Sequence, residues 1–171
     1  MIKCPMCGMP QLEKGLTVCQ FCGYEERPLA ELSKKKIYDL MASYEYEKAE
    51  DGGLRIKAVK NVRDIALRGT VTVPHFVTEI DSEAYSCCKF LADIELPKAL
   101  RVIGDGAFSY CRDLFDVFIP KNVTHMGKGV FANCYDLRVV RCEAPEKPSG
   151  WDEGWLDGCS ARVKWSCKND N

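Results

Sequence analysis

The sequence has few histidines, almost no net charge and no long apolar run. Its 171 residues include 2 histidines, and 24 basic and 25 acidic side chains leave a formal net charge of −1. That balance lacks the basic excess by which proteins attract nucleic acid or anionic membranes. No apolar stretch approaches the roughly 18 residues that a membrane-spanning helix needs. The opening residues MIKCPMC contain no apolar signal-peptide core, so we expect a cytoplasmic protein.

Cysteine, in contrast, is abundant, and the 11 cysteines fall into groups by spacing. One group forms two close pairs: Cys4, Cys7, Cys19 and Cys22. Two other groups recur along the chain and leave Cys87 over: Cys88, Cys111, Cys134 and Cys159, then Cys142 and Cys167. Cysteines that recur in this way behave as small buried apolar side chains. We expect them to stay thiols in a reducing cytosol.

The paired cysteines lie in the stretches CPMCG and CQFCG. Four thiolates from two C-x-x-C pairs suit a single Zn²⁺ ion, which binds them tetrahedrally: Cys4, Cys7, Cys19 and Cys22. A segment this short buries too little apolar surface to fold alone, whereas structural zinc supplies on the order of 10 kcal/mol. The pattern resembles a zinc ribbon of the rubredoxin-knuckle type, and we predict such a ribbon over residues 1–27.

A structural role for this zinc is favoured over the alternatives. Four cysteine ligands leave no open position for catalysis, and a thioredoxin-like redox pair would need one C-x-x-C near a βαβ pattern. Ribbons of this kind sometimes bind nucleic acid. Here the basic side chains are balanced by acidic ones, which leaves no evident phosphate-binding face: Lys3, Lys14 and Arg27 against Glu13, Glu25 and Glu26.

Residues 28–50 have a helical pattern. Pro28 suits the first turn of a helix, and apolar side chains follow at near-helical spacing: Leu29, Leu32, Ile37, Leu40, Met41 and Tyr44. The run Asp51-Gly52-Gly53 is expected to end this helix. We predict a linker or capping helix within residues 28–53 that covers the open apolar end of the repeats that follow.

From residue 54 onward the sequence becomes repetitive. Pro74, Pro97 and Pro120 are each 23 residues apart. The same spacing separates several apolar sets: Val77, Leu100 and Val123; Ile80, Ile103 and Met126; Tyr85, Phe108 and Phe131; Leu91, Leu114 and Leu137. A fixed period of about 20 to 29 residues with leucine-type anchors is typical of a leucine-rich-repeat solenoid.

Each repeat is expected to begin with a short extended segment, followed by a Gly/Asp turn and a short helical turn with the pattern A-F-x-x-C. A strand comes next, in which Leu114, Val117 and Ile119 point inward before the next proline ends it. Single repeats cannot bury their apolar face, so stacked strands about 4.8 Å apart must do so. Trp151 and Trp155 are expected to pack as an end cap rather than form a ligand platform.

These repeats resemble the BspA-like subfamily of bacterial leucine-rich repeats. Its pattern, I-P-x-x-V-x-x-I-G-x-x-A-F-x-x-C-x-x-L-x-x-V-x-I-P, fits residues 70–142 closely and 143–167 loosely. The resemblance implies a curved solenoid used for protein–protein contact, and many relatives are secreted or displayed on the cell surface. We predict an α/β fold: a short leucine-rich-repeat solenoid over residues 54–171, with parallel strands and short helical turns, preceded by the zinc ribbon and the helix.

Outward positions of the strands predict a partner-binding face. Side chains alternate between core and solvent along a strand. The outward set forms a ladder that is acidic in the middle and basic toward the end: Asp93, Glu95, Asp116, Phe118, Val139, Arg141 and Lys164. Phe118 is expected to be an exposed aromatic there, and aromatic and arginine side chains are common interface anchors. A protein or peptide partner fits this pattern, and so does an ordinary charged sheet face.

No enzymatic activity is expected. His75 and His125 fall at variable surface positions without a fixed partner for a catalytic triad, and the inward cysteines have no nearby cation to activate them. The sequence favours a non-enzymatic protein–protein interaction module with a structural Zn²⁺ site. The alternatives are a nucleic-acid-associated zinc-ribbon protein and a redox sensor in which oxidation of the ribbon cysteines ejects zinc.

Overall fold

The computed structural model describes residues 44–59, 69–75 and 77–168, so the predicted zinc ribbon and most of the predicted helix lie outside the described residues. Within those ranges the chain forms short strands joined by turns, without a helix. The strands are β1 (Tyr44–Lys48), β2 (Leu54–Val59), β3 (Gly69–Thr72), β4 (Val77–Ile80), β5 (Leu91–Glu95), β6 (Val102–Ile103), β7 (Asp116–Ile119), β8 (His125–Met126), β9 (Val139–Cys142) and β10 (Arg162–Lys164).

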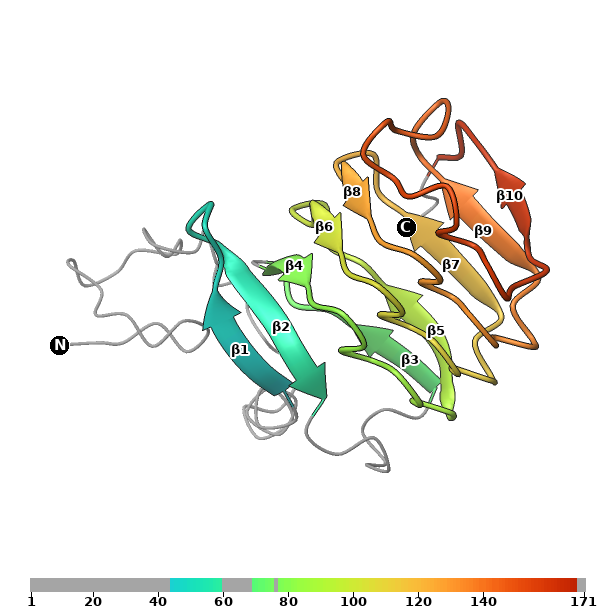
Figure 1. Cartoon of the computed structure of the whole chain (residues 1–171), viewed down its shortest axis with the longest axis horizontal. Helices are drawn as coiled ribbons and strands as arrows, with labels where there is room; N and C mark the ends of the chain where they lie inside the picture. The colour runs from blue at the N-terminus through green and yellow to red at the C-terminus, as the bar shows by residue number, and fades with distance from the viewer. Residues whose placement is uncertain (1–43, 60–68, 76, 169–171) are drawn as a thin grey trace, which may run out of the picture. The chain divides into compact units, whose positions relative to one another are not determined.

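The strands form two sheets, seen in Figure 1 as two rows of arrows. One sheet has the order β1-β2-β4-β6-β8; we call it the hairpin sheet. The other has the order β10-β9-β7-β5-β3; we call it the ladder sheet. From β3 to β9 successive strands alternate between the two sheets, and neighbouring coils pair in parallel. The predicted parallel-strand solenoid is therefore confirmed.

Buried side chains stack in columns between the two sheets. The ring of Phe108 lies between those of Tyr85 and Phe131, with centroid distances of 5.2 and 5.6 Å. All three are fully buried, and burial of a ring of this size contributes about 2–3 kcal/mol. The other columns predicted from the 23-residue period are buried too: Val77, Leu100 and Val123; Ile80, Ile103 and Met126; Cys88, Cys111 and Cys134; Leu91, Leu114 and Leu137.

The segment expected to be a short helical turn is a run of tight turns, so the helical part of the α/β prediction is wrong for the described residues. Two positions in each of three successive coils have a positive φ, which interrupts a right-handed helix: Glu83, Gly106 and Gly129, then Cys87, Tyr110 and Asn133. Peptide N–H groups here donate to the next coil, as Tyr85 does to the Ala107 carbonyl at 2.8 Å. Hydrogen bonds between coils replace those of a helix.

The helix predicted over residues 28–50 is wrong at its end, because residues 44–48 form strand β1. β1 and β2 make an antiparallel hairpin, and β2 runs parallel to β4 in the hairpin sheet. The turn between them needs Gly52, whose φ is 86°, and the Gly53 N–H donates to Asp51 Oδ1 at 2.9 Å. The run Asp51-Gly52-Gly53 therefore reverses a hairpin instead of ending a helix.

Tryptophans close the last coil. Trp151 and Trp155 are 3% and 5% exposed, and their ring centroids are 5.0 Å apart. Trp155 also meets Phe131 edge-on at 6.3 Å, and Trp165 lies 5.8 Å from Trp151. The Trp151 indole N–H donates to the Val123 carbonyl at 2.9 Å, which satisfies its buried polar group. The end-cap packing predicted for the first two tryptophans is confirmed.

Candidate functional site

The outer face of the ladder sheet carries the residues predicted to bind a partner. Strand register places them in two rows that cross the sheet from β3 to β10. One row is Thr70, Asp93, Asp116, Val139 and Arg162; the other is Thr72, Glu95, Phe118, Arg141 and Lys164. We call these two rows the ladder face. It brings together all seven residues of the predicted set, and their role in binding stays a prediction.

Arg141 organises the centre of the ladder face. Its Nε donates to Asp116 Oδ1 at 2.8 Å, and its guanidinium carbon lies 5.8 Å from the centroid of the Phe118 ring. The three side chains are half-buried, so Phe118 is less exposed than the sequence predicts. A cation held over an aromatic ring shields one face of that ring from water. The centre of the ladder face is thus a cluster of three side chains in contact, and not a single exposed aromatic ring.

The ladder face is acidic near one end and basic at the other. Asp93 and Glu95 are exposed on β5, and Glu95 accepts a hydrogen bond of 2.8 Å from the Thr72 hydroxyl. Arg162 and Lys164 are exposed on β10 at the other end. Arg162 is missing from the predicted set although it pairs with Val139, 23 residues earlier. The constant 23-residue spacing could therefore have predicted Arg162 as part of the set, despite the insertion in the last repeat.

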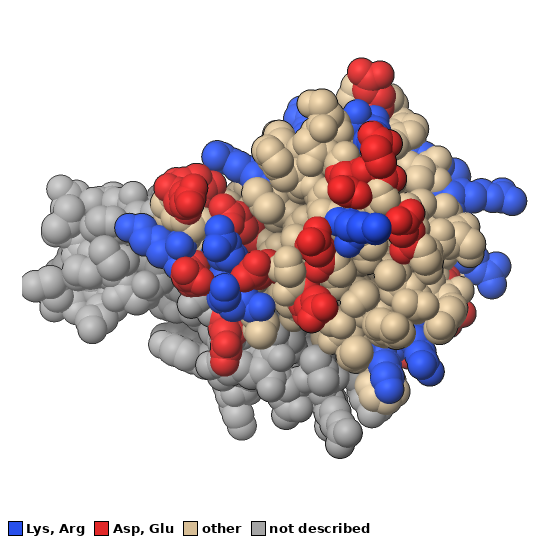
Figure 2. All heavy atoms as spheres, viewed as in Figure 1, with Lys and Arg blue, Asp and Glu red and all other residues tan. Residues whose placement is uncertain are grey.

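One face of the molecule, drawn in Figure 2, shows how acidic and basic side chains are distributed around its described residues. On the face drawn in Figure 2 they lie interspersed and form no large area of a single sign. This agrees with the near-zero net charge of the whole sequence. A surface of this kind gives little long-range attraction for a polyanion, so recognition has to come from local contacts.

The buried cysteines of the coils have a structural role. The thiol of Cys111 donates to the Tyr85 carbonyl at 3.2 Å, and that of Cys134 to the Phe108 carbonyl at 3.1 Å. Burial raises the pKa of Cys134 and that of Cys142 to about 12. Thiolates are thus disfavoured at neutral pH, and these side chains make poor nucleophiles.

The two histidines lie apart from the ladder face. His75 is in the turn between β3 and β4, and burial lowers its pKa below the ordinary value. His125 is exposed on β8 in the hairpin sheet, with its Nδ1 3.0 Å from the Thr124 hydroxyl. His125 pairs with neither a carboxylate nor a cysteine among the described residues.

The four predicted zinc ligands lie outside the described residues: Cys4, Cys7, Cys19 and Cys22. Over the ranges that are described, no group of three or more His, Cys, Asp or Glu side chains is arranged to hold a metal ion. The same residues contain no helix with the length and apolar character needed to cross a membrane.

The stacked coils, parallel sheets and buried columns define a β-solenoid of the leucine-rich-repeat type. Residues 60–149 match the BspA type leucine rich repeat region, in 6 copies. This match covers more than half of the chain, which therefore belongs to the BspA-type leucine-rich repeat family. No curated protein matches the sequence.

Solved structures show the same fold. A leucine-rich repeat protein from Bacteroides capillosus is 21% identical with a TM-score of 0.59, over 72% of this chain and 94% of that one. A leucine rich cell surface protein from Faecalibacterium prausnitzii is also 21% identical, with a TM-score of 0.50, over 74% of this chain and 40% of that one. At this identity the likeness extends to the fold and not to the partner.

Proposed function

We propose that the solenoid is a non-enzymatic module that binds a protein or peptide through the ladder face. The observation that carries this proposal is the strand register, which aligns acidic, aromatic and basic side chains from five neighbouring strands on one outer surface. Leucine-rich repeats commonly serve as scaffolds for protein interaction. Their strands are rigid, so side chains on them are positioned before a partner arrives.

Phe118 and Arg141 are the anchors of this surface. They are half-buried and already in contact, so little side-chain entropy remains to be lost when a partner covers them. Aromatic and arginine side chains near the centre of an interface contribute most of the binding energy. Around them the ladder face offers carboxylates at one end and basic groups at the other. A partner segment lying across the strands would meet these with basic residues over β5 and acidic residues over β10.

A selection from a phage-displayed peptide library tests this proposal without knowledge of the natural partner. Peptides are selected on the full chain, and the affinity of each is then measured on Phe118→Ala and Arg141→Ala. We expect a loss of at least about 1 kcal/mol for each variant, because central aromatic and arginine anchors cost this much when truncated. His125→Ala, exposed on the hairpin sheet, is the matched control and should bind as the unaltered chain does. Equal losses in the control and the ladder variants would contradict the proposal.

The N-terminal cysteines support a second element of the proposal, a structural Zn²⁺ bound by Cys4, Cys7, Cys19 and Cys22. Two C-x-x-C pairs provide the four soft ligands that tetrahedral zinc prefers. We expect one zinc ion per chain by plasma mass spectrometry, and loss of that ion in Cys4→Ser combined with Cys19→Ser. Cys87→Ser should retain the metal. Zinc retained at full occupancy in the double variant would show that the ion is bound by other residues.

The cytoplasmic location stays a prediction. One of the similar structures belongs to a cell surface protein, so the fold also occurs at a cell surface. Fractionation of the native host, followed by detection of the chain in each fraction, tests the location directly.

A further inference from the structure

Large apolar side chains that remain exposed gather at one corner of the coils. Among the residues that the structure describes, they are Phe90 (44% exposed), Tyr110 (43%), Phe115 (52%) and Tyr135 (67%). All four lie in the turns that lead from the buried aromatic column into the ladder sheet, in three successive coils. Single exposed aromatics are ordinary on a protein surface, but a cluster of them marks an interaction site.

Two arginines lie over these rings. The Arg112 guanidinium carbon is 5.9 Å from the Tyr135 ring centroid, and that of Arg138 is 5.3 Å from the Phe115 ring centroid. Arg112 and Phe115 belong to one coil, and Tyr135 and Arg138 to the next, so the two stacks cross between neighbouring coils. We call these four residues the arginine–aromatic corner. Stacking on a ring restricts the plane of a guanidinium and so prepares its N–H groups for a planar acceptor.

Neither arginine has a carboxylate partner within the described part of the chain. Other arginines in that part do form ion pairs: Arg55 with Glu79, Arg101 with Asp51 and Arg141 with Asp116. Asp113 and Asp136 occur in the same turns as the corner but form no ion pair with it. Each guanidinium of the corner therefore presents its fork of N–H donors to the surroundings.

We propose that the arginine–aromatic corner is a second binding surface, which takes an acidic polypeptide segment. Glutamate or aspartate side chains of this segment would accept paired hydrogen bonds from Arg112 and Arg138. Its apolar or tyrosine side chains would cover the exposed edges of Phe115 and Tyr135. Because a guanidinium already covers one face of each ring, the corner favours a carboxylate with an adjoining side chain over a stacked nucleic-acid base.

This surface is distinct from the ladder face. Its side chains lie on the turns before the strands, whereas the anchors of the ladder face, Phe118 and Arg141, lie within β7 and β9. Either surface can therefore fail to bind while the other still does. A partner long enough to pass from the turns onto the strands would contact both.

A labelled peptide of about twelve residues, in which glutamate alternates with tyrosine, is the probe. Its binding to the full chain is followed by fluorescence anisotropy at low salt, where charge-assisted hydrogen bonds are least screened. We expect saturable binding, and at least about ten-fold weaker binding when glutamine replaces every glutamate. Equal affinity for the two peptides would overturn the proposal. Tighter binding of an oligodeoxythymidine of similar length would overturn it in favour of a nucleic acid.

Variants locate the binding. Arg112→Gln with Arg138→Gln should weaken the glutamate peptide about ten-fold or more, whereas Lys98→Gln with Lys121→Gln, which removes two exposed charges from the proline turns, should not. Arg112→Lys with Arg138→Lys keeps the charge but loses the fork, so we expect an intermediate loss. Phe118→Ala should leave this peptide unaffected. Unchanged binding of the peptide by Arg112→Gln with Arg138→Gln, with folding verified by circular dichroism, would contradict the proposed site.

Discussion

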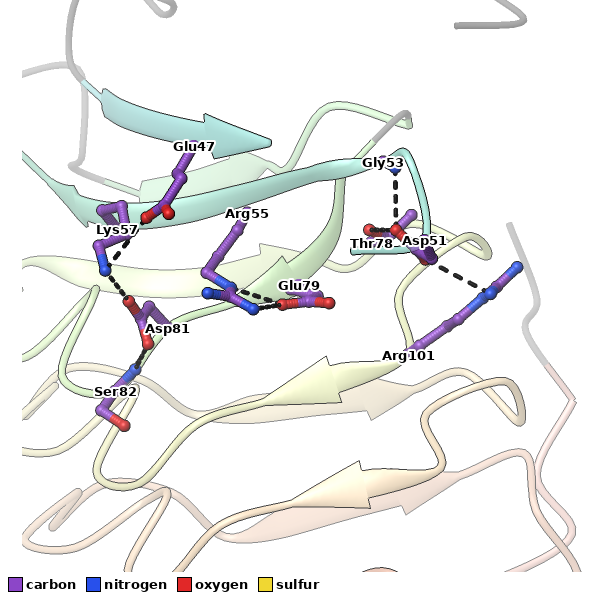
Figure 3. Close-up of polar contacts among 10 residues, drawn as sticks. All are labelled: Glu47, Asp51, Gly53, Arg55, Lys57, Thr78, Glu79, Asp81, Ser82 and Arg101. Carbon is purple, nitrogen blue, oxygen red and sulfur yellow. Dashed lines mark hydrogen bonds and ion pairs between the residues drawn. The ribbon is translucent and has the colours of Figure 1, made fainter. Parts of the chain in front are cut away.

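The two ends of the described solenoid are closed in different ways. At the first end the hairpin sheet is joined by charged and polar side chains, shown in Figure 3. Lys57 lies between Glu47 and Asp81 at 3.3 and 2.7 Å, and Arg55 pairs with Glu79 at 2.5 Å. At the last end, tryptophan rings pack against the final buried phenylalanine. The polar contacts at the first end range from half-buried to exposed, whereas the last end is closed by buried rings.

This difference has an energetic consequence. Exposed ion pairs contribute little, because water and salt screen them and long side chains lose entropy when they are fixed. A buried tryptophan removes a large apolar area from water, and its ring makes many van der Waals contacts with its neighbours. We therefore expect the last end to carry more of the folding free energy per residue, and the first end to respond more to salt and pH. Three substitutions test this comparison, in order of decreasing effect.

Trp151→Ala should cause the largest loss. It empties a buried site and leaves the Val123 carbonyl without its indole donor, so we expect about 3–5 kcal/mol of destabilisation in urea unfolding at pH 7. Trp165→Ala is the matched control, because this ring belongs to the same cluster but is half-exposed, and its loss should be smaller. A loss below about 1 kcal/mol for Trp151→Ala would mean that the terminal coil contributes little.

The repetitive interior of the fold could be predicted from the sequence, because coils that stack in register need the same kind of side chain at the same place. Phe108 and Phe131 reveal their contact through their spacing alone. The turns could not be predicted in the same way. Tyr110 and Asn133 have a positive φ, although nothing in their residue types predicts one. The peptide N–H group of each donates a hydrogen bond to the next coil, which holds the backbone in this conformation. The sequence pattern around Phe108 therefore predicts a helical turn where the chain forms tight turns.

The hairpin and the surface clusters show the same limit. The stretch YEYEK alternates as a strand does, but Tyr44 also continues a helical spacing, and only pairing with β2 decides between them. The rows of the ladder face followed from alternation, so their membership was largely predictable. The half-burial of Phe118 under Arg141 was not, because it depends on how far a side chain on one coil reaches toward the next.

Asp51→Ala should have an intermediate effect at the first end. One carboxylate oxygen of Asp51 accepts hydrogen bonds from the Gly53 N–H at 2.9 Å and from the Thr78 hydroxyl at 3.1 Å, and the other faces Arg101 at 3.4 Å. Thr78 is buried, so its hydroxyl would lose its partner, and we expect about 1–2 kcal/mol of destabilisation in urea. Glu50→Ala, an exposed neighbour, should change stability by less than about 0.5 kcal/mol. Similar losses for both would assign no special role to the Asp51 contacts.

Asp81→Asn should have the smallest effect at pH 7, and the most revealing dependence on conditions. Burial tends to raise the pKa of Asp81, but hydrogen bonds from Lys57 and the Ser82 N–H, with the nearby positive charges, outweigh it and hold the pKa below its ordinary value. A depressed pKa stabilises the fold above the unfolded value of about 3.9, and this contribution disappears as the pH falls toward the lower folded value.

The difference in urea midpoint between the unaltered chain and Asp81→Asn should therefore shrink on acidification from pH 7 to below about pH 4, and also in molar salt at pH 7. The loss caused by Trp151→Ala should persist under both conditions, because burial of a neutral ring involves no proton and is not screened by salt. If the Asp81→Asn difference were equally large at all pH values and salt concentrations, the two ends would be closed by the same kind of interaction, and the contrast between them would fail.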